Sequence, residues 1–427
     1  MYIYQVKAGD TLDAICRLFE VSQEQVIAIN DLSQPDLLAV GQALILPTQT
    51  HSYTVRSGET LGQIANRLGE PLTQLYADNP TLRSRSLLAG ETIFVRQQPA
   101  KRGRLEVNGY AYSTIDPDLL AKTLPSLTYL TVFSYGVTVE GRLVPADDEA
   151  LIAAARDAGV APIMLLSTIG EDGTFNSEAA RAVLEDVTLQ EQLIADLYEV
   201  LTQKGYYGID VDFEFIPETL AAEYAAFIAR LRAEVEPLAV FVALVPKYSA
   251  DQRGLLYEAH DYAALGAAVD RALIMTYEWG YTYGPPMAVA PKNEVRRVLQ
   301  YAVSAIPPEK ILMGMPNYAY DWPLPFERGV TRATSLGNPQ AATLAAQRGA
   351  EILFDSRSAS PHFTYRDEAG LREVWFEDAR SVLGKLELVE EFRLRGIGVW
   401  NIMRPFSQLW YLIDYYYEVA KVLNQSL

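Results

Sequence analysis

Three acidic residues occupy alternate positions in one short stretch, Gly208-Ile-Asp210-Val-Asp212-Phe-Glu214. In a β-strand successive side chains point to opposite faces, so Asp210, Asp212 and Glu214 share one face. Carboxyl groups that are buried together repel one another when charged, which raises the pKa of at least one of them. A carboxylic acid with a raised pKa acts as a general acid at neutral pH. The spacing therefore predicts a catalytic strand, and the alternatives are a structural cluster of acids or a metal site.

The elements that position this strand follow from the pattern of the residues after Leu105. Short apolar runs alternate there with longer amphipathic stretches, which is typical of βα units. The pattern predicts an α/β fold, a (β/α)₈ TIM barrel, whose chemistry lies at the C-terminal ends of the strands. Strands are expected at 105–112, 129–134, 161–166, 208–213, 240–245, 272–277, 310–315 and 396–400. A small α+β insertion is expected between the last two strands, at about 323–390.

The first hundred residues contain an internal repeat. The segment that begins at Tyr4 is similar to the one that begins at Tyr53, an offset of 49 residues that persists at Asn30 and Asn79. In each copy we expect a short strand, two helices and a closing strand. The repeat predicts two small βααβ modules at 1–48 and 51–97, a polar linker at 98–104, and the barrel at 105–427.

Composition and charge restrict the function further. The 427 residues carry a formal net charge of −18, which argues against binding to nucleic acid or to an anionic membrane, because both require a basic face. The single cysteine permits no disulfide and the three histidines stand far apart, so we expect neither a metal nor another cofactor. No run of 18 apolar residues is present, and the N-terminus lacks the pattern of a signal peptide. We therefore expect synthesis in the cytosol.

The acidic strand resembles the Asp-x-x-Asp-x-Asp-x-Glu signature of glycoside hydrolase family 18, the chitinase-like barrel enzymes, with Tyr207 at the position of the first Asp. The resemblance implies that Glu214 protonates the leaving glycosidic oxygen. It implies that Asp212 orients the 2-acetamido group of the substrate and that Asp210 lies beneath it. It also implies a retaining, substrate-assisted reaction, in which the acetamido oxygen rather than an enzyme nucleophile attacks the anomeric carbon.

Two further strand ends fit the same family. Met275-Thr-Tyr277-Glu278 is similar to the family's Met-x-Tyr-Asp, which implies that Tyr277 hydrogen-bonds the acetamido carbonyl, while Glu278 stands in place of the Asp. Trp400 ends the last strand and corresponds to the aromatic floor under the sugar at the cleaved bond. Other candidate substrate contacts, with packing as the alternative, are Tyr110, Tyr135, Trp279, Tyr318, Asp321 and Trp322.

The repeated module resembles the LysM module, which binds glycans that contain N-acetylglucosamine. The family's Gly-Asp-Thr-Leu turn has a counterpart in each copy, Gly9, Asp10, Thr11 and Leu12 in the first and Gly58, Glu59, Thr60 and Leu61 in the second. The resemblance makes these residues candidate glycan contacts. The alternative is that the threonines only cap helices and the glycines only form turns.

Two such modules before such a barrel resemble the spore cortex-lytic N-acetylglucosaminidases of endospore-forming bacteria. The resemblance implies hydrolysis of N-acetylglucosaminyl bonds in cortex peptidoglycan, and deposition on the spore coat or cortex after synthesis in the mother cell. We expect a monomer. A chitinase or chito-oligosaccharide hydrolase is the first alternative, because it shares the catalytic residues. A non-catalytic glycan-binding spore-coat protein is the second, and it is less favoured because Glu214, Asp212 and Tyr277 are all present.

Overall fold

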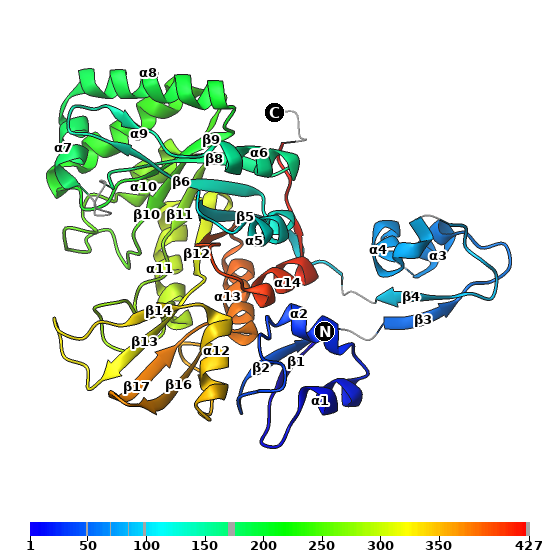
Figure 1. Ribbon diagram of the computed structural model, residues 1–427. Helices are drawn as coiled ribbons and strands as arrows, with labels where there is room; N and C mark the ends of the chain where they lie inside the picture. The colour runs from blue at the N-terminus through cyan, green and yellow to red at the C-terminus, as the bar shows by residue number, and fades with distance from the viewer. Residues whose placement is uncertain (48–49, 69, 84, 97–99, 170–175, 424–427) are drawn as a thin grey trace.

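The computed structural model describes residues 1–47, 50–68, 70–83, 85–96, 100–169 and 176–423 (Figure 1). They form a barrel, a sheet inserted into it, and two small N-terminal modules. Some residues of the predicted domains lie outside the described residues, namely 48, 69, 84, 97, 170–175 and 424–427. The same holds for residues 98–99 of the predicted linker. Within the described part of the chain, no helix has the length and apolar character needed to cross a membrane.

Eight parallel strands close into a ring, which confirms the predicted TIM barrel. Neighbouring strands pair in parallel, and the ring closes because the last strand pairs with the first and the first with the second. The barrel strands are β5 (Gly103–Tyr112), β6 (Tyr129–Val137), β8 (Ala161–Ser167), β9 (Gly208–Asp212), β10 (Ala239–Leu244), β11 (Arg271–Ile274), β12 (Ile311–Pro316) and β18 (Gly396–Trp400). Two short strands extend the sheet, β7 (Leu143–Val144) along β6 and β19 (Tyr417–Val419) along β5.

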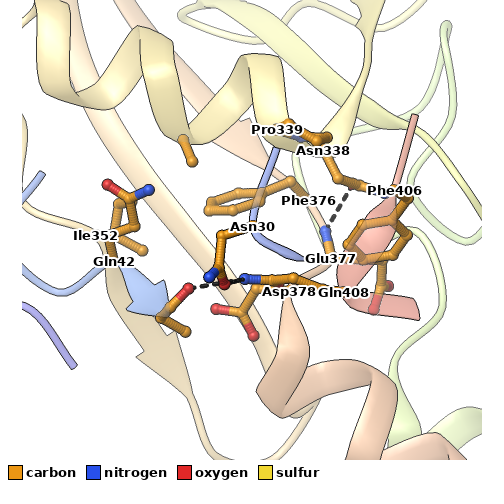
Figure 2. A pocket seen from close by; sticks show the side chains of 12 residues that line it. Asn30, Gln42, Asn338, Pro339, Ile352, Phe376, Glu377, Asp378, Phe406 and Gln408 are labelled. Carbon is orange, nitrogen blue, oxygen red and sulfur yellow. Dashed lines mark hydrogen bonds between the residues drawn. The ribbon is translucent and has the colours of Figure 1, made fainter. Parts of the chain in front are cut away.

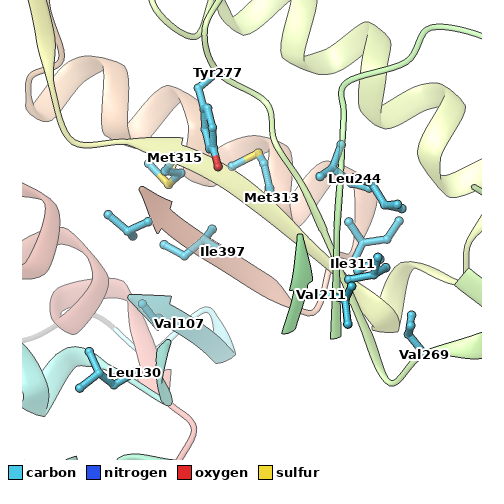
Figure 3. Close-up of a cluster of buried hydrophobic side chains, with 14 of the residues drawn as sticks. Val107, Leu130, Val211, Leu244, Val269, Tyr277, Ile311, Met313, Met315 and Ile397 are labelled. Atoms are coloured by element: carbon cyan, nitrogen blue, oxygen red, sulfur yellow. The ribbon is translucent and has the colours of Figure 1, made fainter. Parts of the chain in front are cut away.

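Helices cover the outside of the barrel and bury the outer faces of its strands. Figure 3 shows part of this main core, where Val211, Leu244 and Ile397 project from three different strands. A second apolar cluster, which includes Tyr129 and Phe241, fills the barrel interior. The helices are α5 (Pro117–Thr123), α6 (Glu149–Asp157), α7 (Ser177–Glu185), α8 (Val187–Lys204), α9 (Ala221–Val235), α10 (Tyr262–Ala268), α11 (Lys292–Ala305), α13 (Ala379–Phe392) and α14 (Ser407–Tyr416), with 3₁₀ turns η2 (Leu124–Ser126), η3 (Glu218–Leu220) and η4 (Pro308–Lys310).

The insertion between β12 and β18 is an antiparallel sheet with one helix. Its strand order is β14-β13-β17-β16-β15. Its elements are β13 (Ala319–Leu324), β14 (Thr334–Leu336), α12 (Asn338–Gln347), β15 (Leu353–Asp355), β16 (Ser360–Asp367) and β17 (Gly370–Trp375). The sheet starts at Ala319 and ends at Trp375, whereas the expected insertion was 323–390. It ends earlier because the following helix, α13, belongs to the barrel. This helix forms ion pairs with α11, Lys292 with Glu387 and Arg296 with Glu391.

Each N-terminal module has the predicted βααβ order, and its two strands pair antiparallel. Each also has a core of its own, around Val26 and Leu44 in the first module and around Ile64 and Leu75 in the second. The first consists of β1 (Tyr2–Gln5), α1 (Leu12–Phe19), α2 (Gln23–Ile29) and β2 (Ala43–Leu46). The second consists of β3 (Thr50–Thr54), α3 (Leu61–Leu68), α4 (Leu72–Asp78), the 3₁₀ turn η1 (Pro80–Arg83) and β4 (Thr92–Arg96).

The two modules differ in how they meet the rest of the chain. The first lies against α14 and the insertion, and Figure 2 shows Asn30 beside Gln408 in this contact. Gln408 Nε2 donates to Asn30 Oδ1 at 2.8 Å and to the carbonyl of Ala43 at 2.9 Å. The carboxylate of Asp31 accepts hydrogen bonds from the backbone N–H and the hydroxyl of Ser407. The second module stands apart from the barrel in Figure 1.

A buried ion pair lies next to this contact. Lys385 Nζ donates to Glu377 Oε2 at 2.7 Å, and both side chains are almost completely buried. We expect Lys385→Met to lower the free energy of unfolding by about 3–5 kcal/mol, because it leaves a buried carboxylate without its cation. Urea denaturation followed by circular dichroism measures this change.

The matched control is Arg296→Met, which removes a half-exposed ion pair with Glu391 between the neighbouring helices α11 and α13. That change should lower the free energy of unfolding by less than about 1 kcal/mol. The double variant Lys385→Met/Glu377→Gln should recover most of the loss, since it removes the buried charge as well. A loss for Lys385→Met no larger than the control would contradict the prediction.

Candidate active site

Strand β9 carries the predicted acids at the mouth of the barrel. Ile209 and Val211 pack in the outer core, so the alternation turns Asp210 and Asp212 toward the barrel interior. Asp210 is fully buried, and its Oδ2 accepts a hydrogen bond from the hydroxyl of Tyr110 at 2.6 Å. Glu214 lies two residues beyond the strand end and is half-buried. Among the described residues, no group of three His, Cys, Asp or Glu side chains is placed to hold a metal ion.

Burial raises the pKa of all three carboxyl groups, and neighbouring negative charges raise the pKa of Asp212 and Glu214 further. Burial raises the pKa of Asp210 to about 6, although the hydrogen bond from Tyr110 acts in the opposite direction. Burial, followed by the negative charge of Glu278, raises the pKa of Glu214 to about 7. Burial and the charges of Glu214 and Asp210 raise the pKa of Asp212 well above its usual range. The strand therefore holds and releases protons near neutral pH, as a general acid requires.

Tyr277 lies just beyond the end of β11, close to the acids of β9. Burial and the charges of Asp212 and Glu214 raise its pKa well above the usual value, so its hydroxyl stays protonated and able to donate. Gly314 of the neighbouring strand leaves room for the ring, because a Cβ there would lie 2.7 Å from Tyr277 Cε1. The structure thus brings together the four residues that were predicted to be catalytic, and their individual roles stay predictions.

Glu278 is held in place by two tyrosines of the insertion. Its backbone has a φ of 67°, in the left-handed region, and its side chain lines a cleft that it shares with Trp400. Its Oε1 accepts hydrogen bonds from Tyr318 OH at 2.5 Å and from Tyr320 OH at 3.2 Å. Both bonds end on Oε1, which leaves Oε2 as an acceptor for a substrate hydroxyl group. Glu278 and Tyr318 therefore both lie where the sequence predicted substrate contacts.

An aromatic wall surrounds Trp400 at the end of β18. Its ring lies 4.9 Å from that of Phe133 and 5.7 Å from that of Tyr110, in edge-to-face contacts. Trp400 lines a hollow of about 290 Å³ together with Tyr112, Glu278, Tyr318, Tyr320, Ser335, Asn401, Met403 and Arg404. An aromatic ring in such a hollow suits the apolar face of a sugar. Tyr110 differs from the prediction, because it is buried and holds Asp210 instead of lining the hollow.

Four other predicted substrate contacts do not line this hollow and are hydrogen-bonded elsewhere. Tyr135 is buried and donates to Asp148 at 2.6 Å. Trp322 is fully buried and donates to the carbonyl of Gly284 at 2.8 Å. For both, the structure supports packing, the alternative that the sequence left open. Asp321 pairs with Arg372 and Tyr365 inside the inserted sheet, and Trp279 donates to Tyr248 OH at 2.8 Å.

Arg404 was not among the predicted site residues, yet it follows β18 and lines the same hollow as Trp400. The guanidinium is half-buried, and Nη1 donates to Ser335 Oγ at 2.8 Å. Burial lowers its pKa from the usual value. Within the described ranges Arg404 forms no ion pair with a carboxylate. Its position four residues beyond a strand-end tryptophan was the signal that pointed to the mouth of the barrel.

The predicted glycan-binding turns have structural roles within their own modules. In the first, Asp10 accepts hydrogen bonds from Tyr4 OH and from the N–H of Lys7, both at 2.7 Å, and Thr11 caps α1. In the second, Glu59 and Thr60 have the same roles, and Thr60 with Gln63 forms a capping box. The turn glycines Gly9 and Gly58 have φ near 86° and 80°, and Leu12 and Leu61 are buried in the cores. A role in sugar contact stays a prediction, since these bonds and a glycan contact are compatible.

Comparison with known proteins relates this site to characterised families. Residues 147–404 match the glycosyl hydrolases family 18, and residues 4–47 and 53–96 each match the LysM domain. The chain is 35% identical over 428 residues to the cortical fragment-lytic enzyme of Bacillus subtilis (strain 168), and the match covers 99% of both proteins.

Solved structures agree with these matches. The spore cortex-lytic enzyme SleL of Bacillus megaterium QM B1551 superimposes with a TM-score of 0.83 and 35% identity over 99% of each chain. A chitinase of Chromobacterium violaceum ATCC 12472 superimposes with a TM-score of 0.68 and 26% identity over 73% of this chain and 98% of that one. The resemblance inferred from the sequence is confirmed. The chain is an enzyme that belongs to the glycosyl hydrolases family 18 and carries two LysM domains.

Proposed function

We propose that this enzyme hydrolyses N-acetylglucosaminyl bonds in the peptidoglycan of the bacterial spore cortex. The observation that carries the proposal is its similarity, along 99% of both chains, to an enzyme named for cortical fragments. The grouping of Glu214, Asp212 and Tyr277 supports it, because these groups supply the acid and the hydrogen bonds that the reaction needs. The LysM domains would add contacts to the N-acetylglucosamine-containing strand.

The proposed reaction proceeds with retention and uses the substrate's own acetamido group. Glu214 donates its proton to the glycosidic oxygen as the bond between that oxygen and the anomeric carbon breaks. The acetamido oxygen forms a bond to the same carbon and gives a cyclic oxazolinium ion, while Asp212 and Tyr277 orient the acetamido group. Water then attacks the anomeric carbon, the oxazolinium ring opens, and the Glu214 carboxylate takes a proton from that water. Tyr110 holds Asp210, the next acid along the same face of β9, by a hydrogen bond to its Oδ2.

Arg404 favours peptidoglycan over chitin as the substrate. It is a half-buried cation that forms no ion pair with a carboxylate in the described part of the chain, in a protein of net charge −18. A cation in such a site gains most from an anionic partner in the substrate. Muramic-type residues carry a lactyl group, which ends in a carboxylate or continues into an acidic peptide except where it is closed into a lactam, whereas chitin carries no anionic group. Chitin hydrolysis stays the second candidate, because the catalytic residues suit both polymers.

We place the enzyme on the spore coat or cortex, where this substrate lies, after synthesis in the mother cell. We also propose that it acts as a monomer, since one chain supplies every group in the mechanism above. No contact with nucleic acid or a membrane is part of the proposal.

Replacement of Glu214 by Gln should abolish most of the activity. The change keeps the shape of the side chain and removes the proton, so the rate of release of reducing N-acetylglucosamine ends from purified cortex should fall about 10²–10⁴-fold. Glu218→Gln is the matched control, because Glu218 is an exposed acid in the same loop region and should be neutral when replaced. Full activity in Glu214→Gln would exclude the mechanism. Digestion of colloidal chitin in parallel tests the choice of substrate.

The pH profile should report the pKa of Glu214. The protonated acid is the active form, so kcat/KM should fall as the pH rises through about 7. Glu278→Gln removes a negative charge that raises this pKa, so the alkaline limb should move toward lower pH. An alkaline limb that stays in place or moves upward would contradict this assignment.

Arg404→Ala should separate the two candidate substrates. The loss of the cation should raise KM for muramic-containing cortex fragments about tenfold, with a much smaller change for chito-oligosaccharides of the same length. Arg332→Ala, an exposed arginine of the insertion, is the control and should change neither. Equal effects of Arg404→Ala on both substrates would remove the support that Arg404 gives to peptidoglycan.

A further inference from the structure

A second hollow, of about 720 Å³, lies where the first LysM domain meets the barrel. One wall comes from α2 and the residues that follow it, and the other comes from α5 and the loop between β18 and α14. Eight of its fifteen lining residues are apolar, among them Ile27, Ala28, Leu32, Leu119, Met403 and Pro405. Asp118 and Lys122 are exposed polar side chains at its edge.

This hollow adjoins the cleft that Trp400 and Glu278 line. Met403 lines both, and it lies three residues beyond Trp400. Helix α5 follows β5, whose last residue, Tyr112, also lines the cleft. The first and last barrel strands are neighbours, so the loops that follow them meet at one side of the mouth. A glycan chain that extended from the cleft past Trp400 on this side would therefore meet the second hollow.

The wall that the LysM domain provides is firmly attached. Asp31 has a φ of 48°, and its carboxylate accepts hydrogen bonds from the N–H of Ser407 at 2.6 Å and from its hydroxyl at 2.7 Å, at the first turn of α14. On the far side of the domain, the N–H of Ile352 donates to the carbonyl of Val40 at 2.8 Å. A Cβ at Gly41 would lie 2.0 Å from the carbonyl oxygen of Ile352, so only glycine permits this approach. The hollow is therefore a fixed part of the catalytic body.

We propose that this hollow is a further glycan-binding subsite, which holds the same N-acetylglucosamine-containing strand that is cleaved beside Glu214. The apolar side chains would contact the C–H faces of the sugar rings, and Asp118 and Lys122 would hydrogen-bond hydroxyl and amide groups at the edge. The first LysM domain is then a wall of the substrate path, and only the second is a separate anchor. The inference rests on the proposed function, because it assumes a glycan strand in the cleft.

The test measures how binding depends on glycan length. The full chain with Glu214→Gln, which does not consume the ligand, is titrated calorimetrically with N-acetylglucosamine dimers and hexamers. The hexamer should bind about tenfold more tightly or better, because only it reaches from the cleft into the second hollow. Ala28→Trp, added to this chain, fills the hollow from an exposed position on α2 and should abolish most of the hexamer's advantage.

Gln23→Trp is the matched control, since Gln23 is exposed on the same helix and does not line the hollow. Asp118→Trp, on the barrel side, gives a second way to fill the hollow if Ala28→Trp does not fold. Equal binding of dimer and hexamer by the parent chain would overturn the inference, as would an advantage that survives both filled variants. Binding of neither glycan would also overturn the inference, whereas the proposed function fails only if the unaltered enzyme does not hydrolyse purified cortex.

Discussion

The main electrostatic constraint on the barrel is that strand β9 encloses two carboxyl groups, with a third two residues beyond its end. Asp210 and Asp212 are buried, and one oxygen of each has no hydrogen-bond partner in the part of the chain that the structure describes. Burial is the main cause that raises the pKa of Asp210 from 3.8 to about 6. A rise of this size lowers the stability by about 3 kcal/mol as the pH increases through this range, because the unfolded chain loses the proton first. The opposite face of the strand offsets this cost, since Ile209 and Val211 are fully buried among the helices.

The barrel and the acidic strand were predictable because both depend on local periodicity. The sequence does not show whether an aromatic ring near a strand end points into the mouth of the barrel or into the packed core. Tyr135 and Trp322 are both buried in the core, where they donate hydrogen bonds to Asp148 and to the carbonyl of Gly284. Arg404 was missed because it lies in a loop without periodicity, and its partner Ser335 is 69 residues away. The attachment of the first LysM domain could not be predicted for the same reason, since Ser407 lies 376 residues from its hydrogen-bond partner Asp31.

The two LysM domains show what a sequence repeat does and does not specify. In both, a buried asparagine ties the second helix to the closing strand. Asn30 Nδ2 donates to the carbonyls of Val26 and Ile45, at 2.7 and 2.9 Å. Asn79 Nδ2 makes the equivalent bonds in the second copy, at 2.9 and 2.7 Å. These bonds hold each module together, so the repeat of Asn at an offset of 49 residues follows from the fold alone.

The contact with the barrel depends on a different set of features. Gly41 and Gly90 occupy the same turn, and both have φ above 80°. A Cβ at Gly41 would nonetheless collide with Ile352, whereas one at Gly90 would meet nothing within 4 Å. The residue after the shared asparagine is Asp31 in the first copy, where it binds the start of α14, and Pro80 in the second. Proline has no side-chain acceptor that could make this bond. The repeat therefore predicts a shared fold, and the residues that differ between the copies decide which module becomes part of the catalytic body.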